Sequence, residues 1–378
     1  MNWQIPLSDI DFGKEEFDAV NQVLQSKWLT MGERTLEFES AFAKYLGAKH
    51  AFAVANGTAA LHISHQVLGL KEGDEVICPS LTFVATANSI LYTGATPVFA
   101  DVTGYNDLNI SPESIKSKIT PKTKAITVVH YGGYPCDMEN IQAIAREYNL
   151  FILEDAAHAP GAEINGKKMG TFGDLGCFSF FSNKNLITGE GGMIVTDNDE
   201  LADKIKRMRS HGMTTLTWDR HKGHAYSYDV LDMGFNYRID EIKAALGVVQ
   251  LSKLDKNNQS RKKLVQYYRE KLSDVMNIQI PFQGYERESS FHIFPILVDP
   301  NIDVIKFRDQ LKGEGIQTSM HYPPIHLFSL YKEKYGYKGG YLPLTEEIAN
   351  REVTLPLYPK MGEESIEYIA QTIISVLS

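Results

Sequence analysis

The chain has 378 residues, of which 43% are hydrophobic, so it is long enough to form two domains around a large core. Its formal net charge is -9, and its composition shows no sign of disorder, collagen or a coiled coil. This acidic balance disfavours a general nucleic-acid binder, because such a protein needs a basic face to displace counterions from phosphates.

Several absences bear on where the protein is located. The amino-terminal residues MNWQIPLSDIDFGKEEF contain no basic stretch followed by an apolar core, so they do not look like a secretory signal. No apolar run is long enough to cross a bilayer. The three cysteines, Cys78, Cys136 and Cys177, are far apart and form no CxxC pair, which fits a reducing compartment. We therefore expect a cytoplasmic protein that does not bind a membrane.

Short apolar runs alternate with helical patterns over about residues 50 to 200, and such runs are typical of strands buried on both faces of a sheet. Between two of them, Asp137 opens a segment with helical spacing of apolar residues, and aspartate is a good N-cap. This alternation predicts an α/β fold with a mostly parallel sheet sandwiched by helices, in which ligands bind beyond the carboxyl ends of the strands. The expected strands are Ala51–Ala55, Glu75–Cys78, Pro97–Asp101, Ala125–His130, Leu150–Glu154, Gly176–Phe181 and Gly192–Thr196.

The pattern changes after roughly residue 240, where a second region begins. Residues Glu241–Tyr268 carry apolar side chains along one stripe, which predicts a long helix. A short strand, His292–Val298, is followed by helical stretches at Val304–Gly313 and Glu363–Leu377. We predict a large domain over residues 1–250 and a smaller α+β C-terminal domain over residues 251–378.

A candidate anion site follows the first expected strand. The segment Ala55–Ala60 reads ANGTAA and lies directly before a helical stretch. Gly57 permits a sharp turn, Thr58 is a candidate N-cap, and the small Ala59 lets an anion approach the free amides of the helix. A simple helix cap at Thr58 is the alternative interpretation.

A candidate acid ends the strand Leu150–Glu154. Asp155 follows this apolar run, and a carboxylate is costly to bury there without a cationic partner. A protonated ring nitrogen of a ligand is one such partner, and an N-cap or a structural ion pair is the alternative. His158 follows three residues later and is expected to support the site rather than to react.

A candidate nucleophile follows the strand Gly176–Phe181. Lys184 comes after this strongly apolar run and before the glycine-rich turn TGEGG at residues 188–192. Most lysines are solvated surface charges, but a lysine in a desolvated place loses its proton more readily, as a Schiff-base nucleophile must. Together with the anion site and Asp155, it matches the needs of pyridoxal 5'-phosphate, which are a held phosphate, a protonated ring nitrogen and an amine for the aldehyde.

Ordered motifs along nearly the whole chain resemble the DegT/DnrJ/StrS-type sugar aminotransferases. The motifs include NGTAAL (Asn56–Leu61), PSLTFVATANSI (Pro79–Ile90), EDAAHAPGA (Glu154–Ala162), SFFSNKNLITGEGGM (Ser179–Met193), GFNYRIDEIKAAL (Gly234–Leu246), GIQTSMHYPPIH (Gly315–His326) and VTLPLYPKM (Val353–Met361). This resemblance implies a pyridoxal-phosphate-dependent transferase of fold type I, related to aspartate aminotransferase.

The resemblance also implies roles for individual residues. Lys184 corresponds to the lysine that holds the cofactor as an aldimine, and Asp155 to the acid that faces the pyridine nitrogen. Phe83 corresponds to the aromatic ring that stacks on the cofactor. Cofactor contacts are further implied at Gly57, Thr58, Ala59, His158, Ser179 and Asn236. In the family the Asn236 segment reaches across from a neighbouring subunit, so a homodimer with shared sites is implied, and either Asn236 or Arg238 meets the phosphate.

The implied reaction converts a nucleotide-linked keto sugar into an amino sugar, with L-glutamate as donor and ping-pong kinetics, in amino sugar and surface polysaccharide biosynthesis. A 4-keto-6-deoxy sugar is favoured, and a 3-keto sugar or an aminocyclitol ketone is the alternative. Some relatives that dehydrate sugars carry histidine in place of Lys184, so the lysine disfavours that reaction here. The intact pair of Lys184 and Asp155 disfavours a non-catalytic regulatory role. Candidate sugar contacts, each with a structural alternative, are Trp28, Thr30, Tyr131, His321 and His326.

Other chemistries receive little support from the sequence. The spacing of Gly170, Gly173 and Gly176 does not fit the G-x-G-x-x-G pattern of a nicotinamide dehydrogenase. His62 and His65 are helically spaced but have no third ligand nearby, so we expect a solvated helix face and no metal site.

Overall fold

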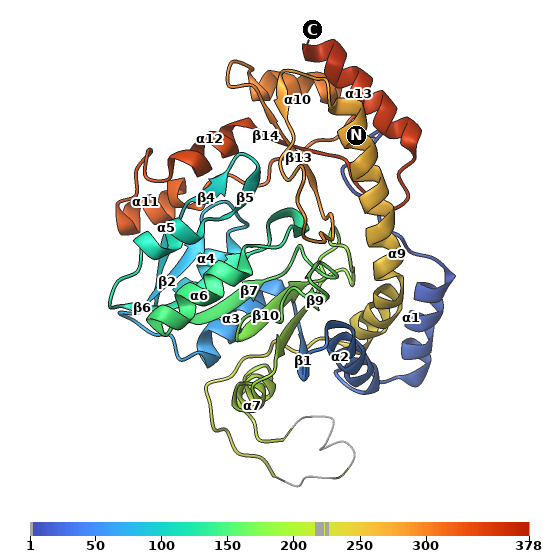
Figure 1. Ribbon diagram of the computed structural model, residues 1–378. Helices are drawn as coiled ribbons and strands as arrows, with labels where there is room; N and C mark the ends of the chain where they lie inside the picture. The colour runs from blue at the N-terminus through green and yellow to red at the C-terminus, as the bar shows by residue number, and fades with distance from the viewer. Residues whose placement is uncertain (1–2, 216–222, 224–226, 378) are drawn as a thin grey trace.

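A seven-stranded sheet forms the centre of the protein, whose computed structural model describes residues 3–215, 223 and 227–377 (Figure 1). Strand β11 is antiparallel to both of its neighbours, whereas the other five contiguous strands pair in parallel. The predicted α/β fold with a mostly parallel sheet is therefore confirmed. In spatial order the strands are β1 (His50–Val54), β11 (Gly192–Thr196), β10 (Leu175–Ser179), β7 (Phe151–Asp155), β6 (Thr123–Val129), β2 (Glu75–Pro79) and β3 (Thr96–Ala100).

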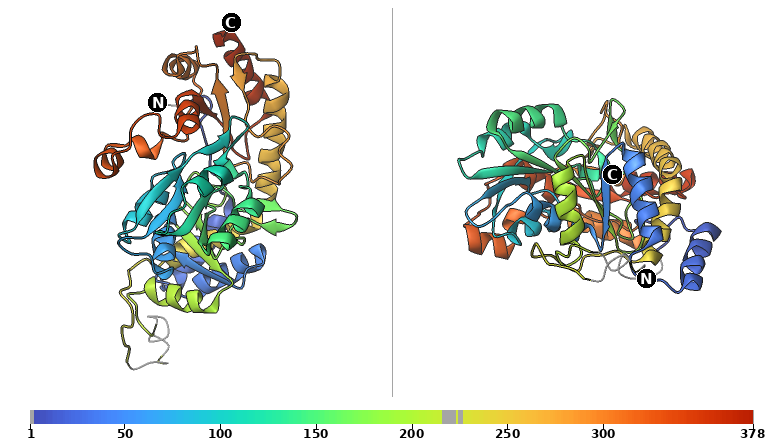
Figure 2. Two further views of the ribbon diagram at one scale, coloured as in Figure 1. Left: turned by 60° about the vertical axis from the view of Figure 1, so that its left-hand side comes forward. Right: turned by 90° about the horizontal axis from the view of Figure 1, so that it is seen from below.

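Helices cover both faces of this sheet (Figure 2). Neighbouring side chains of one strand point to opposite faces, so Ile152 and Leu153 of β7 belong to different core clusters. The cluster around Ile152 includes α2 (Glu33–Leu46) and α6 (Met138–Tyr148), and the cluster around Leu153 includes α3 (Gly57–Val67) and α7 (Asp199–Met208). Asp137 caps α6 as predicted, because its side chain accepts a hydrogen bond from the Asn140 amide.

The remaining elements of the first half are a helix that packs against α9 (Glu241–Leu272) and several short helices and strands. They are α1 (Lys14–Ser26), α4 (Ala85–Leu91), β4 (Val102–Gly104), β5 (Asp107–Ile110), α5 (Pro112–Ser117), η1 (Tyr131–Gly133), β8 (Glu163–Ile164) and β9 (Lys167–Lys168).

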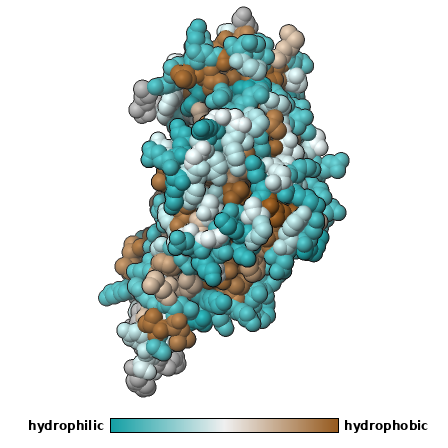
Figure 3. All heavy atoms as spheres, turned by 90° about the vertical axis from the view of Figure 1, so that its left-hand side faces the viewer, coloured by the Kyte–Doolittle hydropathy of each residue, from teal (hydrophilic) through white to brown (hydrophobic). Residues whose placement is uncertain are grey.

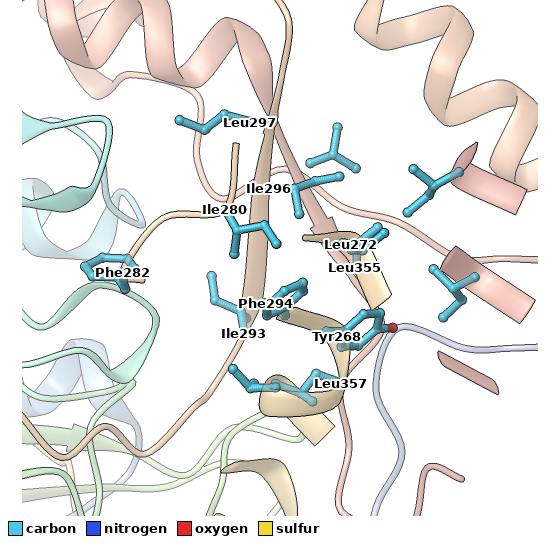
Figure 4. Close-up of a cluster of buried hydrophobic side chains, with 14 of the residues drawn as sticks. Tyr268, Leu272, Ile280, Phe282, Ile293, Phe294, Ile296, Leu297, Leu355 and Leu357 are labelled. Atoms are coloured by element: carbon cyan, nitrogen blue, oxygen red, sulfur yellow. The ribbon is translucent and has the colours of Figure 1, made fainter. Parts of the chain in front are cut away.

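A second sheet, of order β12-β13-β14, organises the C-terminal region around its own apolar core. Figure 4 shows this core, in which the rings of Tyr268 and Phe294 stack with centroids 4.5 Å apart. The predicted boundary at residue 250 falls within the long helix α9 that precedes this sheet. The elements are α9 (Glu241–Leu272), β12 (Ile278–Gln279), β13 (Phe294–Val298), α10 (Val304–Gly313), η2 (Ile325–Leu327), α11 (Ser329–Tyr335), α12 (Pro343–Arg351), β14 (Glu352–Leu355) and α13 (Glu363–Leu377).

The prediction that His62 and His65 lie on a solvated helix face is wrong. Both are buried, because α3 packs between the sheet and neighbouring helices. His65 bonds the Thr127 hydroxyl at 2.9 Å, and His62 lies 3.2 Å from the Tyr237 hydroxyl. Within the described residues, no helix combines the length and the apolar character that a membrane span needs.

A buried carboxylate joins the long helix to the start of α2. Glu241, the first residue of α9, accepts hydrogen bonds from the amides of Gly32, Arg34 and Thr35 at 2.8, 2.8 and 2.9 Å. The Thr35 hydroxyl donates a further bond at 2.6 Å. These amides are donors that a helix start leaves without intrahelical acceptors, and a negative charge is favoured there.

We predict that Glu241→Ala lowers the free energy of unfolding by about 2 to 3 kcal/mol, since buried amides lose their acceptor. Urea denaturation measures this change. Glu37→Ala, which removes an exposed partner of Arg34, is the matched control and should be nearly silent. Equal losses in both variants would contradict the role given to Glu241.

Candidate functional site

The start of α3 lies against the end of β10 at the carboxyl edge of the sheet. A Cβ atom at Gly57 would lie 2.8 Å from the Cβ of Ser179, which is closer than real side chains approach. Gly57 is the first helical residue and has no positive φ, so the close approach, and not a sharp turn, requires glycine here.

The predicted cap at Thr58 is wrong. Asn56 caps α3, since its side chain accepts from the Ala59 amide at 2.8 Å. The Ala59 amide is therefore occupied, and the amides of Gly57 and Thr58 remain as first-turn donors without an intrahelical acceptor. With the Ser179 hydroxyl beside them, they form a cup of donors that suits an anion.

Asp155 is buried at the end of β7, with 6% of its surface exposed. The Thr86 hydroxyl donates to Asp155 Oδ2 at 2.8 Å, and the Ala157 amide donates to Oδ1 at 3.2 Å. Burial raises the pKa of Asp155, while these two bonds and the charge of Lys184 oppose the rise. Sequence reasoning missed Thr86, although it lies within the motif PSLTFVATANSI, three residues after Phe83.

Lys184 lies in the loop after β10 and is half-buried. Burial lowers the pKa of its amine to about 8, and the attraction of Asp155 opposes this shift. Each of these two residues therefore shifts the pKa of the other, although no direct bond joins Asp155 to Lys184.

Two buried histidines stand beside this lysine. The Tyr322 hydroxyl lies 3.1 Å from His158 Nε2, while His158 Nδ1 has no partner among the described residues. The His292 ring lies 4.4 Å from the His158 ring. Burial, reinforced for His158 by the charge of Lys184, holds both pKa values well below the usual range, so both rings are neutral.

Sequence reasoning missed His292 because no local signal marks it. Its Nδ1 lies 3.0 Å from Asn185 Oδ1, and the Asn185 amide nitrogen donates to Asn258 and to the Ser290 carbonyl. The Asn185 oxygen is therefore the acceptor, His292 carries its proton on Nδ1, and His292 Nε2 offers a lone pair.

Phe83 projects from the same edge of the sheet. Its side chain is 58% exposed, which is unusual for so large an apolar ring, and its centroid lies 6.2 Å from that of Tyr322. A flat ligand bound between Asp155 and Lys184 would cover such a ring.

The predicted sugar contacts are dispersed. Thr30 forms a bridge with Asp240 beside the start of α9, and Trp28 packs near Gly32 in the same region. Both ring nitrogens of His326 have protein partners, Ser80 at 2.8 Å and Glu346 at 3.0 Å, so its contacts favour the structural alternative.

Tyr131 and His321 lie together in the interior. The Tyr131 hydroxyl donates its proton to the His321 carbonyl, so this proton is not available to a ligand. Burial, with the charge of Lys184, lowers the pKa of His321 to about 3. His321 is therefore neutral and stays a candidate contact next to Lys184.

Asn236 and Arg238 lie beside the strand that leads into α3. Asn236 is exposed and bridges to Ser210, and Arg238 donates to the Ser210 hydroxyl at 3.1 Å. Arg238 also forms a bridge with Val54 of β1. Among the described residues, no cluster of histidine, cysteine, aspartate or glutamate side chains is placed to hold a metal ion.

We predict that Asp155→Asn lowers the pKa of Lys184 further below about 8, because the variant removes the anion that favours the ammonium form. The rate at which an amine-directed reagent labels Lys184, followed against pH by mass spectrometry in the cofactor-free chain, measures this pKa. Asp199→Asn removes an exposed carboxylate that bonds Lys49, and it should leave the Lys184 pKa unchanged. An identical pKa in wild type and Asp155→Asn would show that the two groups are not coupled.

Comparison with known proteins gives this geometry a family. The sequence profile of the DegT/DnrJ/EryC1/StrS aminotransferase family matches residues 11–374. The spore coat polysaccharide biosynthesis protein SpsC of Bacillus subtilis is 38% identical over 381 residues, covering 100% of this chain and 98% of its own.

Two solved structures are similar over nearly their full length. Helicobacter pylori PseC, an aminotransferase involved in the biosynthesis of pseudoaminic acid, superposes with a TM-score of 0.92 at 32% identity, covering 100% of this chain and 99% of its own. The PLP form of the putative sugar aminotransferase Spr1654 from Streptococcus pneumoniae has a TM-score of 0.91 at 28% identity, with 99% and 98% covered. The predicted family, fold type, enzyme class and cofactor are thereby confirmed, and the chain belongs to the DegT/DnrJ/EryC1/StrS aminotransferase family as a pyridoxal-phosphate-dependent sugar aminotransferase.

Proposed function

We propose that the protein transfers an amino group from L-glutamate to a nucleotide-linked keto sugar, with Lys184 as the reacting amine. The observation that carries this proposal is the position of Lys184 in the loop after β10, near enough to Asp155 at the end of β7 that each shifts the pKa of the other. A 4-keto-6-deoxy sugar is the favoured substrate, and a 3-keto sugar or an aminocyclitol ketone is the alternative. The names of SpsC and PseC, which concern a coat polysaccharide and pseudoaminic acid, support a role in surface polysaccharide synthesis, and the location that we propose for this role is the cytoplasm.

The residues present fit pyridoxal phosphate. The amides of Gly57 and Thr58 and the Ser179 hydroxyl suit its phosphate, since the glycine leaves the space that a Cβ atom would fill. Phe83 offers an uncovered ring for stacking, and His158 Nδ1 is a buried atom that lacks a partner in the described chain. When bound, the cofactor supplies an electron sink for the carbon that exchanges its amino group.

Asp155 and Lys184 have complementary tasks in this proposal. A carboxylate at Asp155 keeps a ring nitrogen protonated, and Thr86 and Ala157 hold that carboxylate in place. Lys184, with a pKa near neutrality, accepts a proton from substrate carbon and returns it as general base and acid. A histidine at residue 184 would lack this amine, which is why lysine supports transamination over dehydration.

We predict that L-glutamate alone changes the visible absorbance of the loaded enzyme and releases one product, 2-oxoglutarate, before any sugar binds. A keto sugar added afterwards should reverse the change, so steady-state kinetics should be ping-pong. A panel of 4-keto and 3-keto nucleotide sugars, followed by absorbance, identifies the acceptor. Intersecting double-reciprocal lines at all donor concentrations would contradict the two-step scheme.

Variants at the two charged residues are the controls for this assay. Lys184→Ala should bind the cofactor without turnover. Asp155→Asn should lose about two to four decades of rate, because it leaves the cofactor's ring nitrogen without its anionic partner, and breaking such a buried pair costs about 3 to 5 kcal/mol. Near-normal activity in Lys184→Ala would overturn the assignment of the amine.

We further propose a homodimer in which the segment around Asn236 contributes to the partner's cofactor site. Asn236 is exposed, and the residues before it present an apolar surface, with Val230, Leu231 and Met233 exposed by 54%, 59% and 87%. Figure 3 shows an apolar patch at the lower end of the molecule, where Figure 1 draws the segment that follows α7. Exposed apolar surface of this kind supports a protein contact, and a two-fold contact closes at two subunits.

We predict that mixing two inactive chains restores activity. One carries Lys184→Ala, and the other carries Asn236→Ala with Arg238→Ala. A mixed dimer contains one site with both an intact lysine and an intact segment, so up to about a quarter of wild-type activity should return after random exchange. Each variant exchanged only with itself is the control. Confirmed subunit exchange without restored activity would exclude shared sites.

A further inference from the structure

A carboxyl group with no charged partner is buried in the C-terminal region. Glu352 is the first residue of β14 and is fully buried. The His321 amide donates to Glu352 Oε2 at 2.7 Å, and the Thr354 hydroxyl bonds Oε1. Arg308 of α10 influences this carboxyl but donates its own bonds to Thr318. Every direct partner of Glu352 among the described residues is therefore neutral.

Thr354 connects this carboxyl to a ring beside the active site. Its Oγ1 lies 2.8 Å from His321 Nδ1 while it also bonds Glu352 Oε1. A hydroxyl has one proton to donate and lone pairs to accept, so it donates to one of these neighbours and accepts from the other. The direction of the two bonds is therefore coupled.

The other end of the His321 ring has no bonding partner among the described residues. His321, Asn183 and Thr354 line a cavity of about 20 Å³ next to the Lys184 loop. Asn183 Oδ1 and His292 Nε2 are buried on this cavity without a partner in the described chain. No described residue bonds His321 Nε2, whose ring lies within the electrostatic influence of Lys184.

We propose that Glu352 is a positioning residue that determines, through Thr354, which nitrogen of His321 carries the ring proton and hence whether His321 donates to or accepts from a bound ligand. Only the identity of that ligand rests on the proposed function. The donor form suits the oxygen of a carbonyl or carboxylate group, which both the keto sugar and the amino-acid donor contain.

The two arrangements differ by one proton. When Glu352 is the neutral acid, it donates to Thr354, Thr354 donates to His321 Nδ1, and the ring proton is on Nε2. When Glu352 is the carboxylate, Thr354 donates to it and accepts from Nδ1–H, and Nε2 has only a lone pair. Conversion of the arrangement with neutral Glu352 to the arrangement with its carboxylate releases one proton. This proton leaves from His321 Nε2 to the ligand or to solvent.

Both arrangements are populated near neutral pH. Burial raises the pKa of Glu352 to about 8, opposed by its bonds from Thr354 and His321 and by the charge of Arg308. His321 itself stays neutral, since its pKa is lowered to about 3. The donor form therefore dominates below about pH 8 and the acceptor form above it. The other titratable groups that face these bonds are Arg308, Tyr131, Tyr322, Lys184, His158 and His292.

Nitrogen NMR of isotope-labelled histidine tests the proposal in the full chain, with His321→Gln used only to assign the signal. In wild type, the His321 proton should move from Nε2 to Nδ1 as pH rises through about 8. Glu352→Gln has nearly the same shape, and its amide donates permanently to Thr354, so His321 should keep the proton on Nε2 at every pH. An unchanged His321 signal across this range in wild type, or the same change in Glu352→Gln, would overturn the proposal.

Two variants at the linking residue separate coupling from packing. Thr354→Ser keeps the hydroxyl and should preserve the pH-dependent change, whereas Thr354→Val removes it and should abolish the change. Persistence of the change in Thr354→Val would exclude Thr354 as the connection.

Kinetics provides an independent readout in the loaded enzyme. Between about pH 7 and pH 9, the ratio of kcat/KM in Glu352→Gln to that in wild type should rise about tenfold, because only wild type loses the donor form. A constant ratio would overturn the effect on the ligand. Absence of amino transfer with every sugar would instead contradict the proposed function. The NMR result would still test the link between Glu352 and the ring proton of His321.

Discussion

The site depends on keeping one acid and one amine apart in a poorly hydrated place. Burial acts on both charges in the unfavourable direction, raising the pKa of Asp155 and lowering that of Lys184, while their attraction across the gap opposes both shifts. Direct contact would satisfy the two charges and leave nothing to attract a ligand. The protein instead holds Asp155 by the neutral donors Thr86 and Ala157, so its charge remains available to a cationic group between the two residues.

The sequence predicts those parts of the structure that local patterns determine. Apolar runs locate all seven strands of the main sheet within two residues of each observed end, and they place Asp155 at a strand end and Lys184 in the following loop. Long-range packing is beyond such patterns. The need for glycine at residue 57 comes from Ser179, more than a hundred positions away, and His65 is buried where α3 packs on the sheet, with a bond to Thr127 of β6. The family resemblance, by contrast, is carried by whole motifs and identifies the cofactor without any of these contacts.

The C-terminal region completes the site with groups that no local signal marks. His292 precedes β13 and Glu352 begins β14, and their importance appears only when the segment before β13 and the strand β14 lie beside the Lys184 loop. In the core of Figure 4, Phe294 of β13 stacks on Tyr268 of α9, and α9 also packs along α1 and α2. A long helix that belongs to both regions limits their relative movement, so that His321 keeps a defined place beside the amine.

The histidine rings around Lys184 are neutral because they are buried in the same poorly hydrated place. His158, His292 and His321 are all buried near Lys184, and burial lowers the pKa of each well below neutrality. A protonated ring at any of these positions would repel a cationic amine and compete with it for Asp155. In the proposed site, the helix amides and the serine hydroxyl would attract a phosphate without adding a full positive charge beside Lys184. Among the described side chains, Lys184 is the one titratable cation that shifts the pKa values of Asp155 and of all three rings. Because the rings beside it are neutral, the proton of this amine can be moved during a reaction.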